Sequence, residues 1–183
     1  YPDFLATVRL PTQQINDYVS VNGGFHLTGN EIGVDAPRGE VCVVEFRDPS
    51  SQKLLAVYKP KSLKVAVPNK IFGGLGSLIL FTANDSISHP AVEVEYKIQS
   101  NTLEARTGLD IVSDIPFTLG NQNMIVEAEI LRWPLDSREI EFNLFTDSRT
   151  KSVNIISDKY FSYESFQNSG MRFGNSEIEK IYD

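Results

Sequence analysis

Hydrophobic and polar positions alternate along much of this chain. The clearest case is the segment 91–98, where every second side chain is apolar: Val92, Val94, Tyr96 and Ile98. The positions between them are charged. Period-two alternation indicates a strand with one dry face and one wet face, because successive strand side chains point to opposite sides. With the apolar run 78–81 and the polar loop that follows it, the stretch 78–98 predicts a hairpin around which the chain is organised.

Other alternating or apolar segments are separated by turns rich in Gly, Pro, Asn and Asp. They are 4–10, 15–21, 41–46, 54–58, 63–67, 124–131 and 139–145. The segment 41–46 is apolar on both faces, which predicts that Cys42, Val44 and Phe46 point into the core. Only 176–183 looks helical, with Ser176 and Glu179 spaced as a capping box. The pattern predicts an all-β fold, an antiparallel β-sandwich or jelly roll with at most a short C-terminal helix.

The length of 183 residues suits a single β-sandwich domain over 1–183, with the connector 101–108 as the candidate internal seam. The net charge of −7 and the scattered basic residues argue against a nucleic-acid partner. No apolar run approaches the ~20 residues needed for membrane insertion, and we expect no signal peptide from the sequence pattern. One cysteine excludes an intrachain disulfide. The start at Tyr1 rather than methionine indicates either processing or truncation.

The most chemical-looking pattern is a set of carboxylates on the segments 124–131 and 139–145, which predict a second hairpin. Val126, Ala128 and Ile130 are expected to face inward on its first strand, and Ile140, Phe142 and Leu144 on its second. If the turn centres near Leu135, Glu129 lies across from Glu141, with Cβ atoms roughly 4.5–5.5 Å apart. Such a pair could bind Ca²⁺, or could serve as the acid and nucleophile of a glycosidase. A solvated acidic face is the simpler alternative, and no other cofactor is indicated.

Aromatic side chains are concentrated in the C-terminal third. Trp133 precedes Pro134 in the expected turn, where it could stack on a sugar, enter a neighbouring subunit or fold back over its own hairpin. The candidate interface or ligand residues are Trp133, Phe145, Tyr160 and Tyr163.

Two other patterns do not predict catalysis. His26 and His89 are expected in turns and supply no spaced set of zinc ligands. Gly73, Gly74 and Gly76 lead into a strand and lack the Gly-Lys-Ser/Thr ending of a phosphate loop, which favours a flexible turn or a bulge.

The segment from Leu63 to Phe81, followed by the alternating strand to Ile98, resembles the N-terminal β-sandwich of phage baseplate upper proteins. Both run from a Val-x-x-Pro-like strand through a glycine turn into paired strands. The resemblance covers about a fifth of the chain, implies a virion structural fold and transfers no functional residue.

These observations predict a non-enzymatic structural or assembly protein of a virus or phage particle, as a capsid, tail or baseplate component. Its expected partners are itself, as a homo-oligomer, or other particle proteins, and its expected location is virion or extracellular. The alternative is a carbohydrate-binding β-sandwich module with calcium as an option, and a third hypothesis is a hydrolase that uses Glu129 and Glu141.

Overall fold

The structure is a computed structural model that describes residues 4–5, 12–28, 31–37, 39–66, 69–83, 85–107, 115–145 and 152–157. In this part of the chain 16 strands form one continuous antiparallel sheet, and a single 3-10 turn, η1 (Ile98–Ser100), is the only helical element. The prediction of an all-β antiparallel fold is therefore confirmed. The segment 176–183, where a short helix was predicted, lies outside the described residues.

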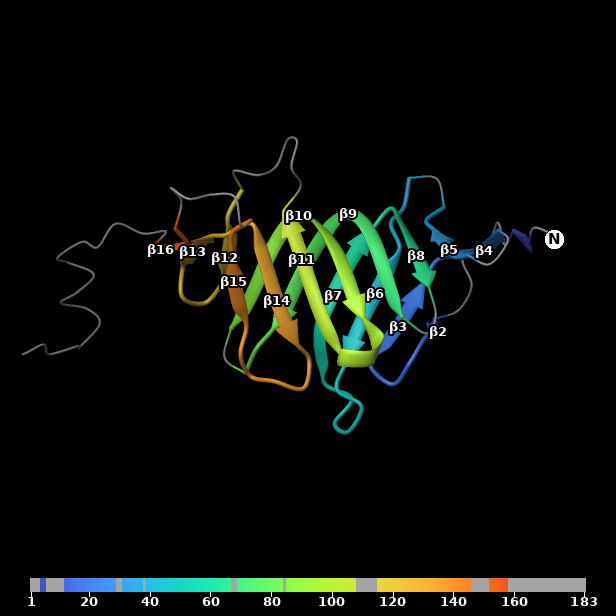
Figure 1. Ribbon diagram of the computed structural model, residues 1–183, viewed down its shortest axis with the longest axis horizontal. Helices are drawn as coiled ribbons and strands as arrows, with labels where there is room; N and C mark the ends of the chain where they lie inside the picture. Colours follow the sequence, from blue (N-terminus) through green and yellow to red (C-terminus); the bar gives the residue numbers. More distant parts are fainter. Residues whose placement is uncertain are drawn as a thin grey trace, which may run out of the picture.

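The sheet folds over on itself into two layers (Figure 1). The first layer contains, in spatial order, β2 (Gln13–Gln14), β3 (Val19–Asn22), β6 (Val43–Arg47), β7 (Leu54–Pro60), half of β9 (Lys70–Phe81), half of β10 (Ser86–Lys97), β12 (Phe117–Leu119), β13 (Met124–Glu127) and β16 (Asn154–Ser157). The second contains β1 (Phe4–Leu5), β4 (Gly24–Thr28), β5 (Glu31–Asp35), β8 (Ser62–Ala66), the other halves of β9 and β10, β11 (Thr102–Thr107), β14 (Ile130–Pro134) and β15 (Glu141–Asn143).

The β9–β10 hairpin belongs to both layers. β9 pairs with β8 over 70–73 and with β7 over 76–80. β10 pairs with β12 at 87–88 and with β11 over 92–97, and its register to β9 shifts at 89–94. Bulges of this kind bend a strand and so let one hairpin pass from one layer to the next. The predicted organising hairpin is confirmed, and the glycine segment 73–76 is part of this bend rather than a phosphate loop.

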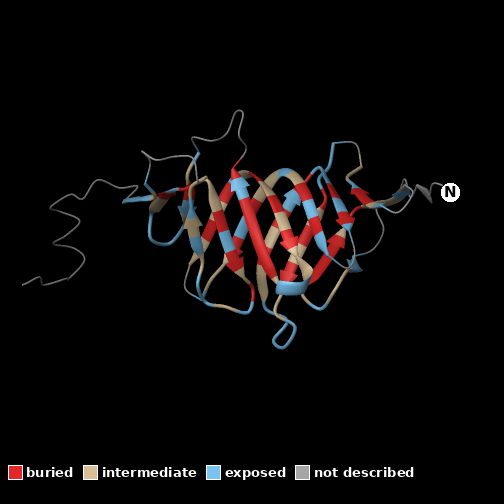
Figure 2. Ribbon diagram, viewed as in Figure 1, coloured by how far each residue is buried: buried red, intermediate tan, exposed pale blue. Residues whose placement is uncertain are grey.

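The core lies between the layers and follows the alternation seen in the sequence (Figure 2). Val92, Val94 and Tyr96 are buried, as predicted from their shared face. Cys42, Val44 and Phe46 are exposed by no more than 1% each, which confirms that they point inward. Phe46 of the first layer meets Tyr96 of β10 edge to face, with ring centroids 5.3 Å apart.

The predicted second hairpin is wrong in its first strand. The chain leaves β13 at Glu127, passes Ala128 and Glu129 outside any strand, and starts β14 at Ile130 in the other layer. Leu131 and Trp133 then point inward, while Ile130 is only half-buried. If the alternation shifts by one residue, the side chains that pointed inward point outward and the reverse. Such a shift occurs at 128–129, and the alternation of the sequence does not indicate it. The predicted connector at 101–108 is also a strand, β11, in the middle of its layer.

Candidate functional site: the open end of the two layers

One end of the molecule is formed by the last strands of both layers, β15 and β16 (left in Figure 1). Among the described residues, β15 pairs only with β14, and β16 pairs only with β13. Each strand therefore has one side with no ladder partner in this part of the chain. An edge of this kind presents backbone N–H and C=O groups to which another strand can pair.

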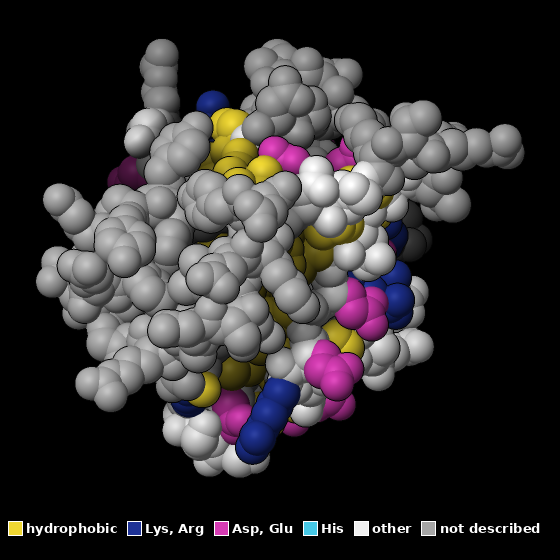
Figure 3. Space-filling view, turned by 90° about the vertical axis from the view of Figure 1, so that its left-hand side faces the viewer, with side chains coloured by type: hydrophobic (Ala, Val, Ile, Leu, Met, Phe, Trp, Pro, Cys, Tyr) yellow, Lys and Arg dark blue, Asp and Glu magenta, His cyan; other side chains and the backbone are white. Residues whose placement is uncertain are grey.

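The edge strand β16 is apolar on both faces. Ile155 is 60% exposed and Ile156 is 43% exposed, although neighbouring strand residues point in opposite directions. Ile115, which precedes β12 at the same end, is 40% exposed. Seen from this end, hydrophobic side chains are visible at several places, with acidic side chains near some of them (Figure 3). Exposed apolar surface at a sheet edge is typical of an interaction site.

Behind the edge, three rings connect the layers. His89 on β10 packs against Phe117 on β12, with ring centroids 4.8 Å apart. Phe117 meets Phe142 on β15 edge to face at 5.6 Å. Phe117 is almost fully buried, whereas Phe142 is half-buried. The contact between the two phenylalanines joins the first layer to the second at the open end.

His89 is buried, with 2% of its surface exposed, and both ring nitrogens have backbone partners. The Ala91 amide donates to Nδ1 at 3.1 Å, so the neutral ring carries its proton on Nε2, which donates to the Ile115 carbonyl at 2.8 Å. Burial lowers the pKa of His89, and its two backbone hydrogen bonds only partly oppose this effect. The ring is therefore a neutral structural link between β10 and the start of β12.

Two carboxylates hold backbone and side chains at the same end. Glu129 Oε2 accepts a hydrogen bond from the Phe145 amide at 2.7 Å, and the Glu129 amide donates to Asn143 at 3.0 Å. Glu127 Oε2 accepts from the Asn154 side chain at 3.0 Å. The bonds of Glu129 join the connection between β13 and β14 to the end of β15, and the bond of Glu127 joins β13 to β16.

The predicted pairing of Glu129 with Glu141 is wrong. Glu141 lies opposite Arg132, because the hairpin register pairs Ile130 with Asn143 and Leu131 with Phe142. Three or more His, Cys, Asp or Glu side chains are nowhere grouped to hold a metal ion within the described ranges. The pairing that suggested both a calcium site and a glycosidase pair is thus not formed.

The other predicted site residues lie in different surroundings or outside the described residues. Trp133 is part of β14 and is buried, with 5% of its surface exposed, and its Nε1 donates to the Ser137 carbonyl at 3.0 Å. Of the three alternatives for Trp133, the structure has the one in which the side chain folds back over its own hairpin, and its burial argues against an interface or ligand role. Phe145 lies half-buried beside the open end, and its interface role stays a prediction. Tyr160 and Tyr163 lie outside the described residues.

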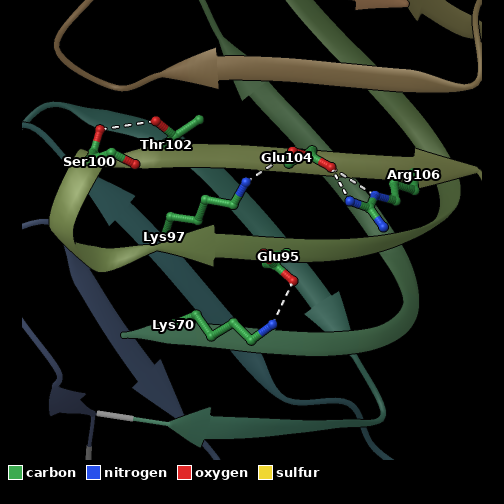
Figure 4. Close-up of polar contacts among 7 residues, drawn as sticks. All are labelled: Lys70, Glu95, Lys97, Ser100, Thr102, Glu104 and Arg106. Atoms are coloured by element: carbon green, nitrogen blue, oxygen red, sulfur yellow. Dashed lines mark hydrogen bonds and ion pairs between the residues drawn. The ribbon is translucent and has the colours of Figure 1, made fainter. Parts of the chain in front are cut away.

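The outer face of the second layer is charged, in contrast to the open end. Lys70 pairs with Glu95 at 3.0 Å, and Lys97 Nζ lies 3.6 Å from Glu104 (Figure 4). Arg106 donates two further hydrogen bonds to Glu104, one of them from Nε at 2.7 Å. Burial alone would raise the pKa of Glu104, but the Arg106 hydrogen bonds and the charges of Arg106 and Lys97 outweigh it and lower that pKa.

A hollow of about 480 Å³ lies on the same charged face, and it contains the second histidine. Its lining residues are His26, Glu31, Gly33, Asp35, Ser62, Leu63, Lys64, Phe72 and Gly74. His26 Nδ1 lies 3.1 Å from an Asp35 oxygen, in a geometry that does not align as a hydrogen bond. Both histidines are on strands, β4 and β10, and not in the predicted turns. They lie on opposite faces of the sheet, since His26 lines an outer hollow and His89 the core.

Comparison with known proteins adds a likeness of fold to solved structures. No protein-family model matches the chain, and no curated protein does. A solved structure with a similar course of the chain is LptH from Pseudomonas aeruginosa, the LptA-homologous periplasmic component of a lipopolysaccharide transport device. It is 9% identical, covers 75% of this chain and 93% of its own, and has a TM-score of 0.48. No function is transferred from it.

The virion hypothesis is corrected on this finding. A solved structure with a similar course of the chain is a periplasmic transport component and not a capsid, tail or baseplate protein. The virion role and the virion or extracellular location are therefore not proposed again. The carbohydrate-binding alternative loses one of its candidate ligand residues, because the side chain of Trp133 is buried in the core. No helix in the described ranges is long and apolar enough to cross a membrane.

Sequence reasoning did not assign the edge strand β16, and it missed the contacts among the rings of His89, Phe117 and Phe142. The adjacent isoleucines 155 and 156 break the alternation that marks a half-buried strand, although their β-branched side chains fit one. The rings come from three segments far apart in the sequence, and only the strand order brings them together.

Proposed function

We propose that this protein is a non-enzymatic assembly module that pairs with a second copy of itself through the edge strand β16. The observation that carries the proposal is an edge strand with no outer partner among the described residues and with isoleucines exposed by 60% and 43%. The backbone of such a strand supplies directional hydrogen bonds, and its side chains supply apolar area that leaves water on pairing.

The strand is suited to pairing with itself. In a two-fold antiparallel arrangement, Ile155 of one copy lies opposite Ile156 of the other, and residue 154 lies opposite residue 157. The contact is isologous and closes at two copies, the commonest symmetry of soluble oligomers. Cross-strand pairs of β-branched side chains stabilise a sheet.

Charge favours the same surface. The chain carries a net charge of −7, so two copies repel each other unless they meet where acidic side chains are few or paired. The four residues of β16 include no charged side chain, and Glu127 beside it is hydrogen-bonded to Asn154. A strand pair is a small interface, so the equilibrium should depend on concentration.

Sedimentation or light scattering over a concentration series tests the proposal. The wild type should move from the 20.5 kDa chain mass towards twice that mass, and Ile155→Lys should stay at the single-chain mass. Ile79→Lys is the matched control, because Ile79 is a 36% exposed isoleucine in the middle of the sheet. A wild type that stays monomeric at every concentration, or an equal effect of the two lysines, contradicts the proposal.

A further inference from the structure

We infer that protonation of His89 releases β12 and thereby loosens the edge strand β16, so that acidity regulates the open end. This inference rests on the proposed function for its biological meaning, because the open end is the proposed pairing surface. The physical step, a proton-dependent opening of β12, concerns the single chain and can be tested without any assembly.

Protonation changes the hydrogen bonds that the two ring nitrogens of His89 can make. Nδ1 accepts a hydrogen bond from the Ala91 amide, and Nε2 donates to the Ile115 carbonyl. A protonated ring has donors on both nitrogens. Nδ1–H would then face the Ala91 N–H, donor against donor, and a positive charge would sit in a site that is 2% exposed. Protonation therefore favours a state in which the ring leaves this site.

The His89 ring is surrounded by side chains of the neighbouring strands β9 and β12. Leu78 of β9 lies opposite His89, and Phe117 of β12 packs on its face. Within the described ranges no ion pair includes His89, and only burial and two backbone groups shift its pKa. The titratable groups of the core between the layers include Tyr58, next to Leu78 on β7, Tyr96 further along β10, and the Cys42 thiol, which interacts with Tyr58. Burial raises the pKa of both phenols, so neither can compensate an imidazolium charge near neutral pH.

β12 and β13 connect His89 to the edge strand β16. The ring holds the Ile115 carbonyl just before β12, and β12 is a strand of only three residues. β12 pairs with β13, and β13 is the one partner of β16 within the described ranges. Phe117 also supports Phe142 on the opposite edge strand β15. A displaced β12 thus removes support from both edges.

The test measures amide hydrogen exchange of β12 between about pH 7.5 and 5.5, the range in which histidine titrates. It uses the Ile155→Lys chain, so that pairing between copies does not contribute. After correction for the intrinsic exchange rate, protection of 117–119 should fall below about pH 6.5, by at most about tenfold per pH unit for a single proton.

Two variants identify the proton. The chain has only two histidines, so His26→Gln is the matched control and should keep the full pH dependence. His89→Gln carries a neutral amide at this site and should remove the dependence. A constant protection of β12, or a pH dependence that survives in His89→Gln, overturns the inference.

If His89→Gln does not fold, an experiment on the wild type alone can still test the inference. In an NMR titration, the His89 ring and the β12 amides should share one midpoint, and separate midpoints overturn the inference. Regulation of assembly is read separately: dimer dissociation in the wild type should increase as the pH falls. A protein that never pairs but opens β12 with acid refutes the proposed function alone, and one that pairs without a response of β12 refutes only this inference.

Discussion

Gly73 and Gly74 are neighbours in β9 with opposite surroundings. A Cβ at Gly73 would lie 2.4 Å from Cε1 of Tyr58 and 2.6 Å from its hydroxyl oxygen, whereas a Cβ at Gly74 would meet nothing within 4 Å. The Tyr58 hydroxyl donates to the Gly74 carbonyl, which holds the ring against the bend of the hairpin.

We therefore expect Gly73→Ala to destabilise the protein by about 1–3 kcal/mol, because a buried tyrosine must move. Gly74→Ala should change stability by no more than about 0.5 kcal/mol. Urea denaturation of the two variants measures this difference. Equal effects would mean that Tyr58 can leave the bend without cost.

At the scale of residues, the sequence predicted burial better than it predicted the roles of surface residues. Cys42, Val44 and Phe46 were correctly assigned to the core, because an apolar strand has no other place to go. Trp133 was assigned to a turn because Pro134 follows it, yet proline is tolerated at the end of β14. The burial of Trp133 depends on which face of β14 points inward, and the sequence of this segment does not indicate that face.

At the scale of elements, the alternation of the sequence located most strands but not the places where the chain changes layers. Ala128 and Glu129 form such a place, and nothing in their chemistry marks it. The unmarked shift of the alternation accounts for the wrong inward assignment of Ile130. The expected pairing of Glu129 with Glu141 fails for another reason: the turn does not centre near Leu135, and the register places Arg132 opposite Glu141. Register between strands depends on turn geometry as well as on hydrophobic pattern.

The charged group on β10 and β11 gives a prediction at this scale. Glu104 is buried on the outer face, where it accepts hydrogen bonds from Arg106 and lies near Lys97. We expect Glu104→Gln to cost about 1–3 kcal/mol at neutral pH, as for hydrogen bonds to a charged group.

Because the folded-state pKa of Glu104 is lowered, its stabilising contribution is complete above the ordinary value of 4.5 and is lost as the pH falls through the folded value. The stability difference between the wild type and Glu104→Gln should thus shrink in acid, as denaturation at several pH values would show. Glu31→Gln is the control, since Glu31 and Lys64 are each more than 70% exposed and should contribute less than about 1 kcal/mol. A difference that persists unchanged in acid would contradict a role of the charge.

At the scale of the whole molecule, the two layers share one hairpin and one core. Phe46 and Tyr96 meet across the layers, and β9 and β10 pair with strands of both. This arrangement favours a single cooperative unit over the residues that the structure describes, as we proposed for the domain organisation.

Phe46→Ala tests this arrangement, because Phe46 belongs to the first layer whereas Trp133, the only tryptophan, belongs to the second. We expect the substitution to cost about 3–5 kcal/mol. It should shift the unfolding transition seen by Trp133 fluorescence and the one seen by circular dichroism by the same amount. Two separate transitions, or a fluorescence transition that does not move, would divide the chain into two units.

The single cysteine has a practical consequence for chemistry on this protein. Cys42 has no exposed surface, and its Sγ lies 3.7 Å from the Val34 carbonyl and 3.6 Å from that of Lys61. A maleimide or disulfide reagent needs an accessible thiolate, so Cys42 of the folded chain should not react with it. A cysteine introduced at an exposed position would then be the one labelled site, and spectroscopic probes can be attached there without removing the native thiol.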